Sequence, residues 1–154
     1  MDPKPIAISG LKSACRIFLQ DLQALPEEAF CKSFGDKVRT VADIVYEVNL
    51  VNEHVAIVIR GEQPFDWPEG GFIKAPEDFR GKDNVMRAFE ASTEKILSTA
   101  ETFSSEEFES PIQHDGGETT RFERYRFMSL HLWYHSGQLN FIQTLLGDDA
   151  WHWK

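Results

Sequence analysis

Two histidines, His131 and His135, are the residues of this sequence best placed to do chemistry. They are four positions apart, so on a helix their side chains lie one above the other and face the same neighbour. Most residues of their stripe are apolar, which is typical of the side that a globular protein turns inward. This stripe comprises Met128, Gln138, Leu139, Ile142, Leu145 and Leu146. Two buried imidazoles cannot both be charged at low cost, so the pair is suited to holding a cation with neutral nitrogens.

A carboxylate, Glu47, falls inside the apolar stripe of an earlier helical segment. That stripe is formed by Ile44, Val51, Val55 and Val58. An ionised carboxylate is strongly disfavoured in an apolar interior, so the fold must give Glu47 a cation or a proton. If the two helices are neighbours, Glu47, His131 and His135 form a three-residue site for Zn²⁺, Ni²⁺ or Fe²⁺, with positions left for water and substrate.

Two alternatives to a metal site stay open at the level of sequence. The histidine pair could be a pair of core residues satisfied by backbone groups, by Glu47 or by Tyr134. Glu47 could form an ion pair with Arg124, which precedes the histidines on the same helix. We favour the metal, because a cation neutralises a carboxylate and two imidazoles that are buried together.

Three further residues are candidates for contacting a substrate. Arg124 and Gln138 flank the histidines and are expected to orient it. His54 lies two turns beyond Glu47, too far to share its metal but able to line the same cavity. No separate general base is evident, so no catalytic residue is assigned.

Length and composition indicate a single compact domain. Its 154 residues suit a single domain, residues 1–154, that buries a core without a structural metal. The net charge of -9 argues against nucleic acid and anionic lipid as partners. The sequence offers neither a signal peptide nor a long apolar span, and Cys15 is expected to be a buried thiol rather than half of a disulfide. We therefore expect a cytoplasmic protein without membrane contact.

Four proline-free stretches with helical spacing predict an all-α, four-helix-bundle fold. The helices are expected at about residues 10–25, 40–61, 83–102 and 120–146. The second is rich in β-branched residues, but it is far too long for a strand, and Thr40 with Asp43 provides a capping pair.

The segments between and after these helices also allow structural predictions. Segment 62–81 is rich in Gly, Pro and aromatic residues and is expected to be an ordered crossover that spans the bundle end to end. Residues 111–120 are compatible with a small hairpin or an extended loop. The tail 148–154 has two tryptophans and is expected to dock on the bundle or on a partner subunit.

The run from His131 to Leu139, with the pattern HxxxHxGQL, resembles the last-helix signature of DinB-like proteins (DinB/YfiT superfamily). The run from Thr40 to Glu47 resembles the start of their second helix, and the similarity in element order covers nearly the whole chain. The resemblance implies a four-helix bundle with a long crossover after the second helix, a homodimer, and a divalent metal held by one second-helix residue and the two histidines. Members commonly have histidine where this chain has Glu47, which would make the site more negative.

The resemblance implies functions of two different classes. One is a metal-dependent enzyme, thiol-transferase-like or a hydrolase, which activates a thiol or a water at an open metal position. Its partners would be a small-molecule substrate and a low-molecular-weight thiol. The alternative is a non-catalytic stress-response or small-ligand-binding dimeric module, so the sequence leaves open whether the protein is an enzyme.

Overall fold

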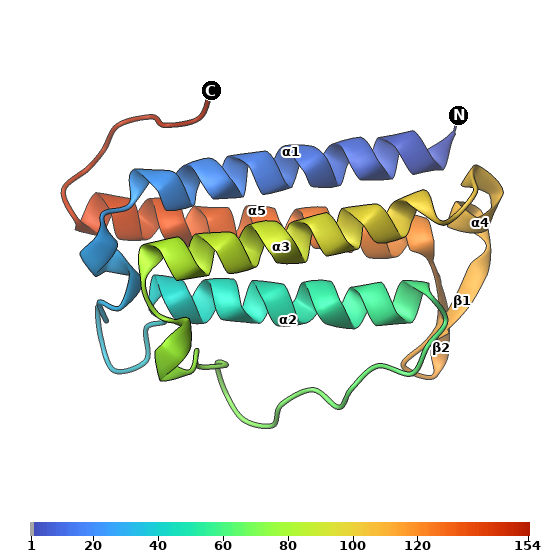
Figure 1. Ribbon diagram of the computed structural model, residues 1–154, viewed down its shortest axis with the longest axis horizontal. Helices are drawn as coiled ribbons and strands as arrows, with labels where there is room; N and C mark the ends of the chain where they lie inside the picture. Colours follow the sequence, from blue (N-terminus) through green and yellow to red (C-terminus); the bar gives the residue numbers. More distant parts are fainter. Residues whose placement is uncertain (1) are drawn as a thin grey trace.

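A computed structural model describes residues 2–154 of the chain. Four long helices form a bundle, and two short strands form a hairpin at one end of it (Figure 1). The long helices are α1 (Pro3–Ala24), α2 (Val41–Ile59), α3 (Lys82–Glu101) and α5 (Arg121–Leu145). The short elements are the 3-10 turns Glu27–Phe30 and Glu77–Phe79, helix α4 (Ser105–Glu109), β1 (Pro111–His114) and β2 (Gly117–Thr120).

The order of the helices in space confirms the predicted crossover. Helices α1 and α5 run in one direction and α2 and α3 in the other, and segment 60–81 returns along the length of the bundle between α2 and α3 (Figure 1). Helix α5 packs mainly on α1 and less extensively on α2. The fold is therefore all-α with a long crossover after the second helix, as the sequence predicted.

The first helix begins earlier than the sequence predicted. It starts at Pro3 rather than near residue 10, and Oδ1 of Asp2 accepts a hydrogen bond from the backbone N–H of Lys4 at 3.0 Å. Both Pro3 and Pro5 lie in the first turn, where an N–H has no helical acceptor and proline is tolerated. The short helix α4 was not predicted, although Ser104 and Glu107 form a capping box there.

Helix α2 begins at the predicted capping pair. The hydroxyl of Thr40 accepts a hydrogen bond from the N–H of Asp43 at 3.1 Å, and Oδ2 of Asp43 accepts one from the N–H of Thr40 at 3.0 Å. The second oxygen, Oδ1, accepts a hydrogen bond from the N–H of Ala75 at 2.8 Å. Asp43 thus caps α2 and also fixes the crossover segment against the start of that helix.

Residues 111–120 form a hairpin rather than an extended loop. Strands β1 and β2 are antiparallel, with Ile112 opposite Thr119 and His114 opposite Gly117. Asp115 and Gly116, at the turn, both have positive φ, 49° and 74°. Asp-Gly is favoured in two-residue hairpin turns because these residues adopt that backbone conformation at low cost.

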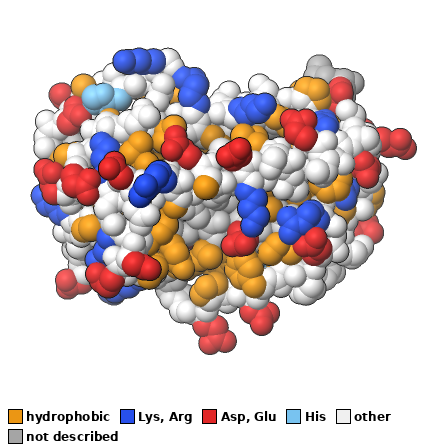
Figure 2. All heavy atoms as spheres, viewed as in Figure 1, with side chains coloured by type: hydrophobic (Ala, Val, Ile, Leu, Met, Phe, Trp, Pro, Cys, Tyr) orange, Lys and Arg blue, Asp and Glu red, His pale blue; other side chains and the backbone are white. Residues whose placement is uncertain are grey.

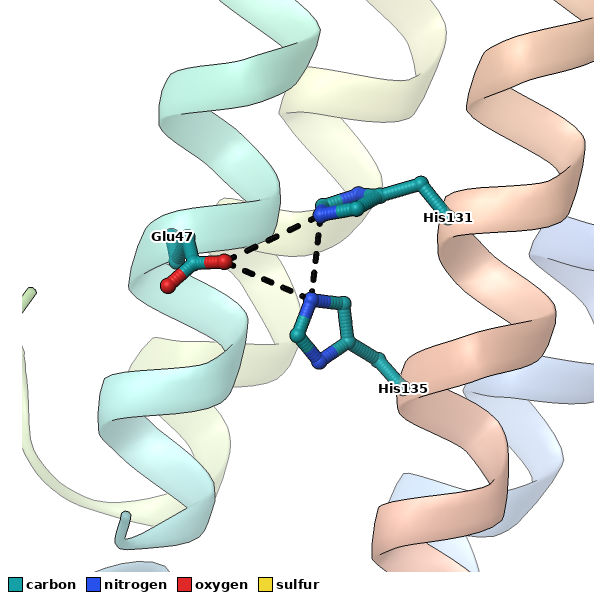
Figure 3. A group of neighbouring side chains, drawn as sticks. All are labelled: Glu47, His131 and His135. Atoms are coloured by element: carbon teal, nitrogen blue, oxygen red, sulfur yellow. Dashed lines mark hydrogen bonds and ion pairs between the residues drawn. The ribbon is translucent and has the colours of Figure 1, made fainter. Parts of the chain in front are cut away.

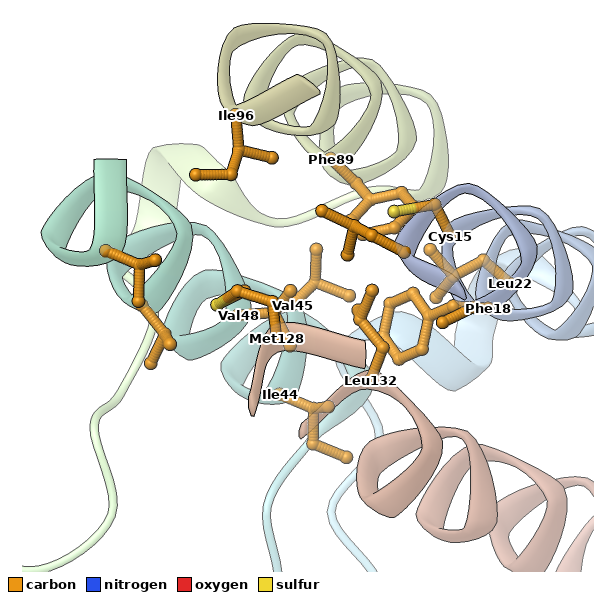
Figure 4. Close-up of a cluster of buried hydrophobic side chains, with 14 of the residues drawn as sticks. Cys15, Phe18, Leu22, Ile44, Val45, Val48, Phe89, Ile96, Met128 and Leu132 are labelled. Carbon is orange, nitrogen blue, oxygen red and sulfur yellow. The ribbon is translucent and has the colours of Figure 1, made fainter. Parts of the chain in front are cut away.

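The core fills the space between the four long helices (Figure 4). Phe18 of α1 and Phe89 of α3 pack with ring centroids 4.9 Å apart, and Leu132 of α5 is fully buried. The buried hydroxyl of Tyr125 donates a hydrogen bond to the carbonyl of Ile96 at 2.8 Å. The prediction that Leu145 faces inward is wrong: it is 49% exposed, whereas Ile142 and Leu146 in the same part of α5 pack against the core.

The tail, residues 148–154, docks on the helical bundle of its own chain. This is the first of the two predicted arrangements, the other being contact with a partner subunit. The indole N–H of Trp153 donates to Oδ1 of buried Asp21 on α1 at 2.6 Å, and the hydroxyl of Ser136 on α5 donates to Oδ2 of the same carboxylate. The amide of Gln143 donates to the carbonyl of Ala150 at 2.9 Å. Asp21 therefore links the tail, α1 and α5.

Other expectations from composition can be compared with the structure. Cys15 is buried and Cys31 exposed, and both are free thiols. On the face drawn in Figure 2, the side chains of Lys and Arg are interspersed with those of Asp and Glu. Within residues 2–154, none of the helices combines the length and the apolar character needed to cross a membrane.

Candidate metal centre

The three predicted ligand residues meet between α2 and α5 (Figure 3). Glu47 lies in the second turn of α2, where the Thr40 cap sets the helical register. His131 and His135 lie on successive turns of α5, and their rings point toward the carboxylate of Glu47. The i, i+4 spacing on one helix and a single inward carboxylate on the other bring the three groups together.

Their potential ligand atoms converge. Oε1 of Glu47 lies 3.8 Å from Nε2 of His131 and 3.5 Å from Nε2 of His135, and the two Nε2 atoms are 3.0 Å apart. The side chain of His135 is fully buried, whereas those of Glu47 and His131 are 15% and 13% exposed. The cluster is therefore largely shielded from water.

Gln138 determines which nitrogen of His135 faces the cluster. Nδ1 of His135 lies 2.8 Å from Oε1 of Gln138. An amide oxygen only accepts hydrogen bonds, so Nδ1 of His135 carries the proton and Nε2 presents its lone pair to Glu47 and His131. A hydrogen-bond acceptor behind a metal-ligating histidine fixes its tautomer and its ring orientation in this way.

Burial keeps both imidazoles neutral. For His131, burial acts together with neighbouring His135 and the positive charge of Arg39 to lower the pKa to about 3. The pKa of His135 is also lowered, chiefly by burial. Neutral imidazole is the form that binds a metal, so neither ring has to lose a proton first near neutral pH.

Glu47 has an ion-pair partner, and it is not the one considered from sequence. Nη1 of Arg39 lies 2.8 Å from Oε2 of Glu47. Arg124 instead places its guanidinium over the ring of Phe127, 4.8 Å from the centroid. The proposed pairing of Glu47 with Arg124 is therefore wrong, and Arg39 takes that place.

Arg39 was missed because it precedes the Thr40 cap and so lies outside the helical pattern from which the other residues were found. Its position depends on the path of the chain before α2, which spacing along a helix does not reveal. The available signal was a basic residue two turns before an inward-facing carboxylate.

A pocket of about 400 Å³ adjoins the cluster. Arg39 and Gln138 line it, and each also contacts a member of the cluster, Glu47 and His135 respectively. Its remaining walls are mainly apolar and come from the segment before α2, from α2 itself, from the crossover and from α5, with Phe72 and Phe141 among them. Gln138 therefore lies at a position from which it can contact both a metal ligand and a bound small molecule.

The other two candidate substrate residues lie elsewhere. His54 belongs to an aromatic cluster with Phe65, Trp67 and His114, at centroid distances of 5.3, 5.8 and 5.9 Å. Burial and the neighbouring His114 lower the pKa of His54. Neither His54 nor Arg124 lines the pocket beside the cluster.

The donor set fits a divalent cation. Two imidazole nitrogens and one carboxylate oxygen are typical of catalytic zinc and non-haem iron sites, and they leave coordination positions open. Because Gln138 holds the proton on Nδ1 of His135, Nε2 of that ring and Oε1 of Glu47 are two buried acceptors that face each other. Nδ1 of His131 is buried without a hydrogen-bond partner in the described part of the chain.

The cluster is also distinctive within the molecule. Across residues 2–154, it is the one group of three His, Cys, Asp or Glu side chains whose ligand atoms all lie within 4.8 Å of one another. A cation between the three atoms would satisfy the facing acceptors, which a single shared proton cannot do for all of them.

Comparison with known proteins points to one family. A model described as the DinB superfamily matches residues 11–139. Among solved structures, a conserved protein from Enterococcus faecalis is similar, with a TM-score of 0.70 over 96% of this chain and 99% of that chain. The sequence identity is 13%, so this likeness concerns the fold alone. No curated protein matches the chain.

Proposed function

Because the chain belongs to the DinB superfamily, we propose that it is a metal-dependent enzyme with Glu47, His131 and His135 as its metal ligands. The observation that carries this proposal is the convergence of three ligand atoms, from one buried and two largely buried side chains, within 4.8 Å of one another. A pocket large enough for a small molecule is lined by Arg39 and Gln138, which contact Glu47 and His135, and this supports turnover of a substrate rather than a purely structural ion.

The chemistry follows from the open coordination positions. Glu47, His131 and His135 would hold a divalent cation (zinc, nickel or iron), which would supply the Lewis acidity that activates a thiol or a water as a nucleophile. Gln138 holds the ring of His135 in the ligating orientation. The substrate is a small molecule in the adjoining pocket. The proposed second reactant is a low-molecular-weight thiol, which makes the reaction a thiol transfer, or a water, which makes it a hydrolysis.

Elemental analysis of protein purified without nickel resin tests the proposal. We expect one divalent cation per wild-type chain and loss of that cation in His135→Ala. His114→Ala is the matched control, because His114 lies on the hairpin outside the cluster. Stoichiometric metal retained by His135→Ala would refute the assignment of the ligands.

A non-catalytic module that binds a small ligand is the competing function, and the same pocket is compatible with it. Zinc-loaded protein incubated with simple electrophiles and several cellular thiols separates the two. Metal-dependent formation of product supports the enzyme, whereas binding without consumption of either reactant supports the module.

A further inference from the structure

Arg39 is more deeply buried than an arginine with one partner should be. Its side chain is 11% exposed, and its Nη1 faces Oε2 of Glu47 as an ion pair at 2.8 Å. Its Nε is buried with no hydrogen-bond acceptor in the described residues. A guanidinium has five N–H donors, and leaving one of them buried and unpaired is unfavourable. The arrangement is therefore incomplete without a further acceptor.

The pocket is where that acceptor can enter. Arg39 and Lys37 both line it, and no Asp or Glu is among the side chains that do so. The guanidinium carbon of Arg39 lies 4.0 Å from the centroid of the Phe72 ring, which holds the planar group at the pocket wall. The pocket thus combines two positive charges with an apolar surface that includes Phe141.

The balance of charge changes when a metal is bound. Without metal, the negative charge of Glu47 is matched by the positive charge of Arg39. A divalent cation on the cluster leaves a net charge of about +2 on these groups, and Lys37 adds one more. The charge on the cluster and Arg39 is largely buried, whereas Lys37 is exposed, and an anion in the pocket would stabilise this positive charge.

We propose that Arg39 has two roles: it neutralises Glu47 in the metal-free protein, and in the metal-loaded protein it binds the carboxylate of an organic anion in the pocket. The substrate class is an amphipathic carboxylate, with its apolar part against Phe72 and Phe141 and its charged end at Arg39 and Lys37. This inference rests on the proposed function, because it requires metal at the cluster.

Gly137 also lines the pocket and offers a position at which to fill it. It lies in the middle of α5, where glycine costs helix stability relative to alanine. A Cβ added there would meet nothing within 4 Å, and the residue lines the pocket. A Cβ at this position is therefore accommodated, and a larger side chain is expected to extend into the pocket, whose lining includes none of the three candidate metal ligands.

Zinc and benzoate are the two probes for the test, with uncharged benzamide as the matched control ligand. Zinc affinity is measured by competition with a chelating dye, and binding of benzoate to the zinc-loaded protein is measured by calorimetry. The variants are Arg39→Met, which removes the charge, Arg39→Lys, which keeps it, and Gly137→Leu, which fills the pocket.

Arg39→Met is expected to bind benzoate at least about tenfold more weakly, because it loses a charge-assisted contact with the carboxylate. It is expected to bind zinc about tenfold more tightly, because the cation that competes with zinc for Glu47 is lost. A role confined to folding would weaken both. Arg39→Lys is expected to retain part of the benzoate affinity. Gly137→Leu is expected to lose benzoate binding with zinc affinity unchanged, and benzamide is expected to bind wild type weakly.

The results of these measurements distinguish a failure of this inference from a failure of the proposed function. Wild-type protein that takes up no zinc would refute the proposed function, and with it the metal-dependent role of Arg39. Wild-type protein that takes up zinc, with benzoate bound equally well by wild type and Arg39→Met, would refute the role of Arg39 alone. Weaker zinc binding in Arg39→Met would also overturn it.

Discussion

At the scale of single residues, the hydrogen bond between Gln138 and His135 determines which ring nitrogen of His135 faces the candidate metal site. Replacing Gln138 with Leu removes the acceptor for Nδ1 of His135, so the ring is free to adopt the other tautomer and other orientations. We expect zinc affinity to fall by about 10- to 100-fold, as is usual when the hydrogen-bond partner of a metal-ligating histidine is lost.

Gln138→Glu is the matched control for this change, because it keeps an acceptor oxygen at the same distance along the side chain. Competition with a chelating dye measures both variants. Equal zinc affinities for Gln138→Leu and wild type would show that the ring is held by packing alone.

Asp21 makes stability depend on pH. Burial raises its pKa, although hydrogen bonds from Ser136 and Trp153 act in the opposite direction. The carboxyl of the unfolded chain therefore ionises first as the pH rises, and in the window between the ordinary and the raised pKa the unfolded state holds fewer protons. The contribution of Asp21 to stability is thus fully present at low pH and declines as the pH rises through that window.

Asp21→Asn is expected to remove this decline. The free energy of unfolding, measured by urea titration from pH 3 to pH 8 (roughly the range in which buried carboxyls titrate), should fall less steeply with pH in the variant than in wild type. Asp149→Asn, at an exposed carboxylate, is the control. Identical pH profiles for wild type and Asp21→Asn would contradict the assignment.

At the scale of elements, the sequence predicted the helices that carry the ligands but not every boundary. Apolar spacing along α2 and α5 indicated an inward Glu47 and an inward pair of histidines, because all three lie on regular helix. Arg39 could not be found this way, since the path of a loop depends on tertiary contacts. The proline-free stretches do not reveal the early start of α1, because the first turn of a helix accepts proline at Pro3 and Pro5.

The Asp43 carboxylate joins the start of α2 to the crossover segment. Removing it should therefore lower the free energy of unfolding by more than the loss of a helix cap alone. Asp43→Ala removes the acceptors for the N–H groups of Thr40 and Ala75, and we expect it to lower the free energy of unfolding by about 2 kcal/mol or more. Thr40→Ala removes only the cap hydrogen bond to Asp43 and should cost about 1 kcal/mol.

Urea unfolding of both variants measures the difference. If Asp43→Ala and Thr40→Ala lose equal stability, the contact with Ala75 contributes nothing, and the crossover segment is held by other interactions.

At the scale of the whole molecule, the outer side of α5 is expected to contact a second copy of the chain. Phe127, Leu130, Tyr134 and Phe141 are 41–63% exposed and lie on one side of the helix. The net charge of -9 makes copies repel one another, so an uncharged apolar stripe is the part of the surface best suited to a homodimer.

Leu130→Glu places a charge in the middle of this stripe and is expected to shift the protein toward monomer in light-scattering measurements across a dilution series. Ile6→Glu is the matched control, because Ile6 is 47% exposed on α1, outside the stripe. A wild-type monomer at all concentrations, or equal effects of the two substitutions, would refute the predicted interface.

The division of the candidate ligands between two helices has a consequence for local opening of the bundle. Both imidazoles belong to α5 and the carboxylate to α2, on the side where α5 packs less extensively than it does on α1. An ion shared by these groups must be released before the two helices can separate there. Amide hydrogen exchange in the adjoining turns of α2 and α5 should therefore slow on addition of zinc, while exchange in α3 changes little.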